Sequence, residues 1–113
     1  MNENVLDAAA IESLRELGGE ELVAEVRNIF VAEIPALISG VEDAARRGQA
    51  DAMWKAAHAI RSIAANAGAT RLALLCDTVQ ERGYAGSVEG ADELVQQLWA
   101  EFDRARAALE AIS

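Results

Sequence analysis

The chain has 113 residues, the length of one domain, and 52% of them are hydrophobic, many of these alanine, whereas aromatic residues make up 4%. With a formal net charge of −9, it lacks the basic surface that binds nucleic acids or anionic membranes. No apolar run is long enough for a transmembrane helix, and the single cysteine, Cys76, cannot form an internal disulfide. We therefore expect one soluble, cytoplasmic domain over residues 1–113 that binds neither nucleic acid nor membrane.

The first half of the chain predicts two helices. Apolar residues recur every three to four positions over 7–17, with Asp7 as a candidate N-cap and the glycine pair at 18–19 as the end. The same period continues over 20–47, a helix that contains Pro35. Because a proline inside a helix removes one backbone hydrogen bond, we expect a kink or a break near Pro35.

The second half predicts three more helices, over 51–67, 70–82 and 88–112. Gly68 and Gly83 end the first two of them, and no segment alternates with the period of two that is typical of strands. Short loops make consecutive helices antiparallel neighbours. The predicted fold is therefore all-α, an up-down-up-down antiparallel four-helix bundle with a short additional N-terminal helix across one end. Four side chains are interpreted as core or core edge: Cys76, Tyr84, Trp99 and Phe102.

The only histidine, His58, is predicted to lie on the solvent side of the helix over 51–67. On a helical wheel, the apolar side chains form one stripe: Met53, Ala57, Ile60, Ala64 and Ala67. His58 points about 140° away from the centre of this stripe. A buried histidine held by a core hydrogen bond is the alternative, and this angle disfavours it.

Two basic residues flank His58 on the same face, because Lys55 lies three residues before it and Arg61 three residues after it. No acidic residue occurs between 52 and 76, although the chain as a whole is acidic. We therefore expect an anion beside His58 to be bound by Lys55 and Arg61, with no carboxylate nearby to repel it.

Three further residues share the neighbourhood of His58. Ser62 and Ala65 are small, which would let a partner approach the imidazole closely, although both can also be filler in an alanine-rich helix. Trp54 lies off the centre of the apolar stripe. It can be a docking residue, part of the core edge or part of a homodimer seam, and the sequence leaves all three open.

The parts of common active sites are missing from this sequence. There is no second histidine for a metal site, no glycine-rich loop after a strand for a nucleotide, and no recognisable triad. What remains is nucleophilic chemistry by His58 itself, because a neutral imidazole can attack an electrophilic phosphorus and carry the group. The rest of the catalytic apparatus would have to come from a partner.

These features resemble the histidine-containing phosphotransfer (HPt) domain of multistep two-component phosphorelays. The family's motif reads His-x-Leu-Lys-Gly-Ser/Ala-Ser/Ala-x-x-x-Gly, and residues 58–68 read HAIRSIAANAG. The segment over 11–44 looks like the family's first two helices, and RLALLCDTVQERG over 71–83 looks like the helix after the site. Two positions depart from the motif, because Arg61 replaces its lysine and Ser62 replaces its glycine. These departures concern the rate of transfer and the choice of partner.

The resemblance implies that His58 accepts a phosphoryl group from the phospho-aspartate of one receiver domain and passes it to an aspartate of another. Arg61 and Lys55 would stabilise the phosphate, and Trp54, Ser62 and Ala65 would face the receiver. The expected partners are response-regulator receivers of a hybrid sensor kinase and of a downstream regulator. The receiver would supply Mg²⁺, so we expect this chain to have no cofactor and no metal site of its own. We also expect a monomer without ATP-binding or kinase activity.

The alternative function is an HPt-like helical interaction module. Such a module would bind or sequester a receiver or another signalling enzyme without carrying phosphate. Arg61 and Ser62 motivate this alternative, because they change the two motif positions nearest to the chemistry.

Overall fold

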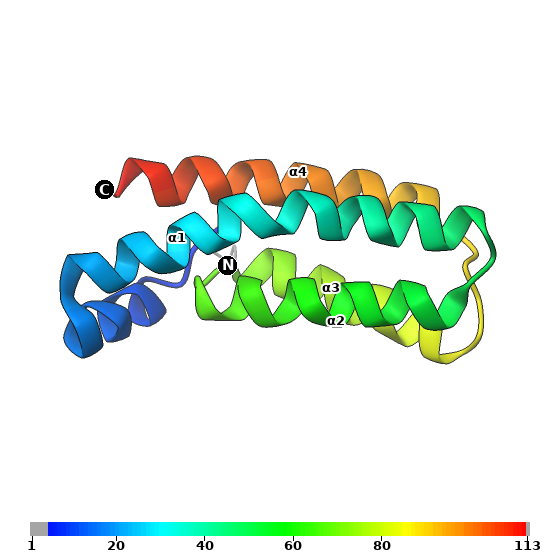
Figure 1. Cartoon of the computed structure of the whole chain (residues 1–113), viewed down its shortest axis with the longest axis horizontal. Coiled ribbons are helices and arrows are strands. Elements are labelled where there is room, and N and C mark those ends of the chain that lie inside the picture. Colours follow the sequence, from blue (N-terminus) through cyan, green and yellow to red (C-terminus); the bar gives the residue numbers. More distant parts are fainter. Residues whose placement is uncertain (1–4, 113) are drawn as a thin grey trace.

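The computed structural model describes residues 5–112, and within this range the regular structure is entirely helical. Its helices are α1 (Ala8–Arg46), α2 (Ala50–Asn66), α3 (Thr70–Tyr84) and α4 (Ala91–Ala111). The four helices lie side by side, and each runs opposite to the one before it (Figure 1). Helices α1 and α3 each pack against α2 and α4. This is the all-α, antiparallel four-helix arrangement that the periodicity and the short loops predict.

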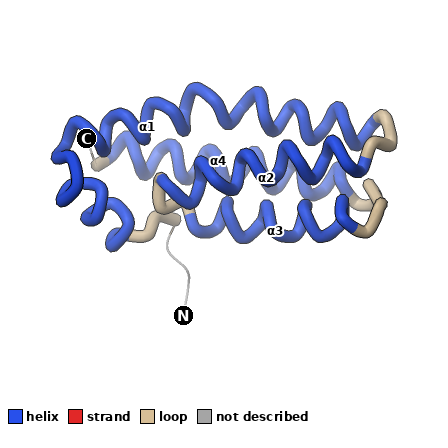
Figure 2. Tube along the Cα trace, turned by 60° about the horizontal axis from the view of Figure 1, so that its bottom comes forward, coloured by secondary structure: helices blue, strands red, loops and turns tan. Residues whose placement is uncertain are grey.

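Helix α1 consists of two parts that meet at Gly19. The φ of +70° and ψ of −164° at this residue lie outside the helical region, in a conformation that suits glycine. The two parts correspond to the helices predicted over 7–17 and 20–47. The first part folds back at one end of the bundle (Figure 2). There the Asp7 side chain accepts a hydrogen bond from the Ala9 amide, and the Asp7 amide donates to the carbonyl of Gly68 in the α2–α3 turn.

The sequence predicts a kink or a break near Pro35, and the structure shows no break there. Gly19 is the one residue inside α1 with non-helical backbone angles, so the helix continues through Pro35. Ile34 and Ile38 on either side of the proline are fully buried. Their packing holds the segment helical, because the proline removes only one backbone hydrogen bond from a helix that is otherwise anchored in the core.

The ends of the last two helices also differ from the prediction. Helix α3 does not end before Gly83 but continues to Tyr84, and α4 begins at Ala91 rather than at residue 88. Gly83 is buried inside α3, and a Cβ atom there would lie 2.6 Å from the Trp54 Cβ and 2.8 Å from the Ala50 carbonyl oxygen. This glycine therefore permits α2 and α3 to approach closely instead of ending the helix.

The core lies along the axis of the bundle. The rings of Phe30 in α1 and Phe102 in α4 stack at 5.3 Å between centroids, and Trp99 meets Phe102 edge-on. All the residues of the apolar stripe predicted for α2 are buried. Cys76 is also fully buried, as predicted, and this burial raises the pKa of its thiol to about 12. The thiol is therefore part of the packing and is not a reactive group near neutral pH.

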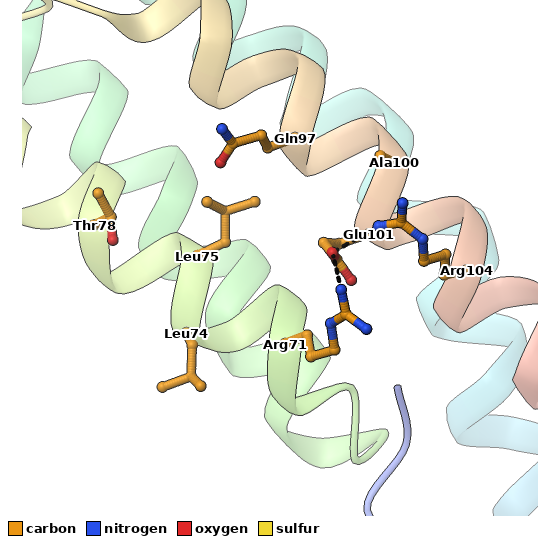
Figure 3. Close-up of a pocket in the computed structure, with 8 residues that line it drawn as sticks. All are labelled: Arg71, Leu74, Leu75, Thr78, Gln97, Ala100, Glu101 and Arg104. Carbon is orange, nitrogen blue, oxygen red and sulfur yellow. Dashed lines mark hydrogen bonds and ion pairs between the residues drawn. The ribbon is translucent and has the colours of Figure 1, made fainter. Parts of the chain in front are cut away.

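An ion-pair cluster joins α3 to α4 in a surface hollow (Figure 3). The Oε2 atom of Glu101 accepts from Arg71 at 3.0 Å and from Arg104 at 2.7 Å, and the Glu101 side chain is only 13% exposed. Within residues 5–112, no helix is both long and apolar enough to cross a membrane. The same residues hold no group of three or more His, Cys, Asp or Glu that could bind a metal ion.

Candidate phosphoryl-accepting site

His58 lies midway along α2 with its side chain exposed, on the face opposite the buried stripe of that helix. This is the orientation that the helical wheel predicts. The stripe anchors α2 in the core through Ile60 and Ala57, and the register of the helix then directs His58 outward.

The imidazole of His58 is held by one side chain from the neighbouring helix. Its Nδ1 atom lies 3.2 Å from Oε1 of Gln80 in α3, and Gln80 is 9% exposed. An amide oxygen can only accept, so this hydrogen bond requires that Nδ1 carries the proton. The neutral ring then has its lone pair on Nε2. This atom makes no hydrogen bond to residues 5–112. Gln80 thus holds the orientation of the His58 ring, and its amide oxygen favours the tautomer with the proton on Nδ1.

The sequence led us to expect Arg61 in a patch free of acidic residues, but in the structure a carboxylate lies beside it. Its Nε atom donates to Oδ1 of Asp77 in α3 at 2.5 Å, and the two side chains are 44% and 40% exposed. The prediction failed because the run without acidic residues ends at Cys76, one position before Asp77. Packing of α2 against α3 then brings this carboxylate to Arg61.

Lys55 is also paired with a carboxylate. Its Nζ atom lies 3.0 Å from Oδ2 of Asp51, one turn earlier on α2. The Nε1 of Trp54 donates to the other oxygen of Asp51 at 2.9 Å. The hydrogen bonds from Lys55 and then from Trp54 lower the pKa of Asp51, so that this carboxylate stays charged. Both cations that flank His58 are therefore neutralised by neighbouring acids.

An aromatic pair lies beside this cluster. Trp54 is half-buried and stacks on Tyr84 of α3, with 4.4 Å between the ring centroids. Tyr84 is 66% exposed, so its assignment to the core or core edge is wrong. It lies in the last turn of α3, where the helix extends past the core residues Val79 and Gly83. Trp54 and Tyr84 form a partly exposed apolar surface near one end of the α2–α3 pair.

The two small residues after His58 are both exposed on α2. The Ser62 hydroxyl donates to the backbone carbonyl of His58 at 3.3 Å, and therefore lies against its own helix. Ala65 follows one turn later. Because both side chains are small, few atoms project from α2 on this side of His58, which leaves room for a partner to approach the ring.

Several residues of the site were missed by sequence reasoning, above all Gln80 and Asp77. The feature of the sequence that predicts both residues is the pairing of positions across the α2–α3 hairpin. The contacting pairs 54 with 84, 58 with 80, and 61 with 77 each lie at equal sequence distances from Ala69. An antiparallel helical hairpin with a short turn brings such positions together, so the partners of His58 could have been sought on α3 once the turn was located.

The assembled site offers one chemical capability. An exposed imidazole has one ring nitrogen held by a neutral acceptor and the other free to act as a nucleophile. Charged side chains that can bind an anion lie one turn away on the same face, namely Arg61 and Lys55.

Comparison with known proteins agrees with this geometry. The family model described as Hpt domain matches residues 25–108 of the chain. The chain is similar to the crystal structure of histidine-containing phosphotransfer protein B (HptB) from Pseudomonas aeruginosa PAO1, with 25% sequence identity and a TM-score of 0.89. The similarity covers 97% of this chain and 95% of that chain. No curated protein matches the sequence. Since the family model covers well over half of the sequence, the chain belongs to the Hpt domain family.

Proposed function

We propose that this chain has a histidine phosphotransfer role in a phosphorelay, which its membership of the Hpt family and its likeness to HptB support. We propose that His58 is the residue that carries the phosphoryl group between two receiver domains. The observation that supports this proposal best is the exposed imidazole whose Nδ1 is bound by Gln80, because this contact leaves Nε2 available as a nucleophile.

The chemical step is an in-line displacement at phosphorus. The Nε2 lone pair attacks the phosphorus of a receiver phospho-aspartate and forms a P–N bond, while the P–O bond to the aspartate breaks and the carboxylate leaves with the electron pair. The ring becomes positively charged, and Nδ1 keeps its proton in the hydrogen bond to Gln80. Transfer to the second receiver reverses the step, because an aspartate oxygen attacks the phosphorus and Nε2 regains its lone pair.

Charge neutralisation and positioning supply most of the catalysis in phosphoryl transfer. Arg61 and Lys55 lie one turn on either side of His58 and would bind the phosphoryl oxygens. The Mg²⁺ that such reactions use would belong to the receiver, so this chain requires no cofactor of its own.

Docking of the receiver would use the same face of α2. The low surface formed by Ser62 and Ala65 would admit the receiver's phosphorylated loop close to His58. The aromatic pair Trp54 and Tyr84 offers apolar contact area at the other side of the ring. We expect a monomer that serves a receiver of a hybrid sensor kinase and a receiver of a downstream regulator.

The test is transfer of labelled phosphate from a phosphorylated receiver in the presence of Mg²⁺. The wild-type protein should acquire a label that is labile in acid and stable in alkali, and His58→Gln should acquire none while its helical circular dichroism is unchanged. A matched control places a new exposed histidine on α4, as Gln97→His in the His58→Gln protein. This ring lies away from Gln80 and should stay unlabelled.

Two results would contradict the proposal. Label on the His58→Gln protein would mean that another residue accepts the phosphoryl group. Binding of the phosphorylated receiver without any label on the wild-type protein would instead support a non-catalytic interaction module.

A further inference from the structure

The cation nearest in sequence to His58 on its C-terminal side is already engaged. Arg61 donates to Asp77, and Asp77 lies on α3 one turn before Gln80, the residue that holds the imidazole. The ion pair and the hydrogen bond are thus neighbouring cross-links between the same two helices. A phosphoryl group on His58 would arrive beside an arginine that another anion already occupies.

The two anions differ in strength. A phosphoryl group on a side chain carries about −1.5 to −2 charges near neutral pH and presents three acceptor oxygens, whereas a carboxylate carries a single charge. The ion pair of Arg61 with Asp77 is partly exposed on both sides, so water screens it. Asp77 can be hydrated when Arg61 leaves, because its side chain is 40% exposed.

The pair on the other side of His58 is built differently. Asp51 accepts from Trp54 as well as from Lys55, and these three residues are within one turn of α2. Asp77, by contrast, is bound by Arg61 across the interface between two helices. Because residues three apart on a helix are neighbours, the Arg61 side chain can turn from Asp77 toward His58 by rotation about its own bonds.

We infer that Asp77 is a positioning residue that competes with the phosphoryl group for Arg61, an inference that rests on the proposed phosphorylation of His58. When His58 is free, Asp77 holds Arg61. When His58 carries the phosphoryl group, Arg61 exchanges Asp77 for the phosphoryl oxygens, and the released carboxylate repels the same group. Asp77 thereby weakens the retention of phosphate and favours its onward transfer.

The experiment loads His58 from phosphoramidate, a small-molecule phosphoryl donor, so that no receiver is needed. The ³¹P signal of the phosphohistidine is then titrated with pH, because a bound cation lowers the proton affinity of the phosphoryl group. The variants are Asp77→Asn, Arg61→Gln and the double substitution. Glu81→Gln is the matched control, since it removes an exposed carboxylate from the next turn of α3 without an ion pair to Arg61. Lys55 and Asp51 are unchanged in every protein.

Asp77→Asn should lower the proton affinity of the phosphoryl group about two- to fivefold, the range of an exposed ion pair, and more than Glu81→Gln does. In the Arg61→Gln background, the effect of Asp77→Asn should fall to that of Glu81→Gln. If Asp77→Asn and Glu81→Gln have equal effects in the wild-type background while His58 is labelled, the inference is overturned and the proposed function stands. If His58 of the wild-type protein stays unlabelled both with phosphoramidate and with a phosphorylated receiver and Mg²⁺, the proposed function itself fails and the inference falls with it.

Discussion

The contact between Gln80 and His58 leads to the sharpest prediction about the site. Substitution of Gln80 by methionine keeps an unbranched side chain of similar length and removes the acceptor for Nδ1. Because Gln80 is buried beneath an exposed ring, the methionine can pack where the glutamine did. The change therefore acts on the imidazole and not on the core.

The expected size of the effect follows from the hydrogen bond. A neutral hydrogen bond of this kind contributes about 0.5–1.5 kcal/mol net, and a tenfold change in an equilibrium corresponds to about 1.4 kcal/mol. Without it, the ring samples both tautomers and other orientations, so the fraction of His58 that presents a free Nε2 falls. The initial rate of phosphoryl acceptance should drop about two- to tenfold, by the same arithmetic.

Two measurements check this prediction. The rate is followed with phosphoramidate as the donor, and the tautomer of His58 is read from the ¹⁵N chemical shifts of its two ring nitrogens. Gln97→Met, which changes an exposed glutamine on α4, serves as the control and should leave both quantities unchanged. The reasoning is refuted if the proportions of the two His58 tautomers are the same in Gln80→Met as in the wild-type protein, whatever happens to the rate. A side chain with a merely structural role would leave these proportions unchanged.

Two further substitutions test the packing. Gly83→Ala should lower the free energy of unfolding by about 1–2 kcal/mol in urea, because its Cβ would meet Trp54 and the Ala50 backbone, an overpacking that outweighs the gain in helix propensity. Gly40→Ala is the matched control in α1, because the atom nearest to its new Cβ is the Ala56 Cβ at 3.9 Å. This substitution should stabilise the fold by up to about 1 kcal/mol. Equal effects of both alanines on the free energy of unfolding would contradict the argument. The raised pKa of Cys76 means that the folded state holds this proton more tightly than the unfolded state. The resulting stability is complete below pH 9 and is lost as the pH rises toward about 12. The free energy of unfolding, measured in urea between these pH values, should decline as the pH rises, and Cys76→Ala should reduce this decline. An identical decline in both proteins would disprove the contribution of the Cys76 proton.

The helices and the outward orientation of His58 were predictable because both depend on local periodicity. The apolar stripe of α2 has a period that only a helix satisfies, and the position of His58 on the wheel follows from residue numbers alone. Gly19 was predictable as an interruption for the same local reason, since two adjacent glycines disfavour continuation of a helix.

The errors arose where contacts between helices decide the outcome. Pro35 and Gly83 are both unfavourable in an isolated helix, yet both lie inside helices here. Pro35 lies between the buried residues Ile34 and Ile38, and Gly83 lies where α2 and α3 approach closely at Trp54. The charge around Arg61 was misjudged because a window of sequence does not include the facing helix, which contributes Asp77.

The hairpin symmetry about Ala69 has a consequence for the cost of ordering the site. Gln80, Asp77 and Tyr84 reach their partners across a single short turn, so each contact is formed between segments that the turn has already brought together. Loop closure adds little entropy loss in such a case, whereas the stacking of Phe30 on Phe102 must join the two ends of the domain. The groups that orient His58 therefore belong to the most local part of the topology, and we expect variation in α1 and α4 that preserves the bundle to leave their alignment unchanged.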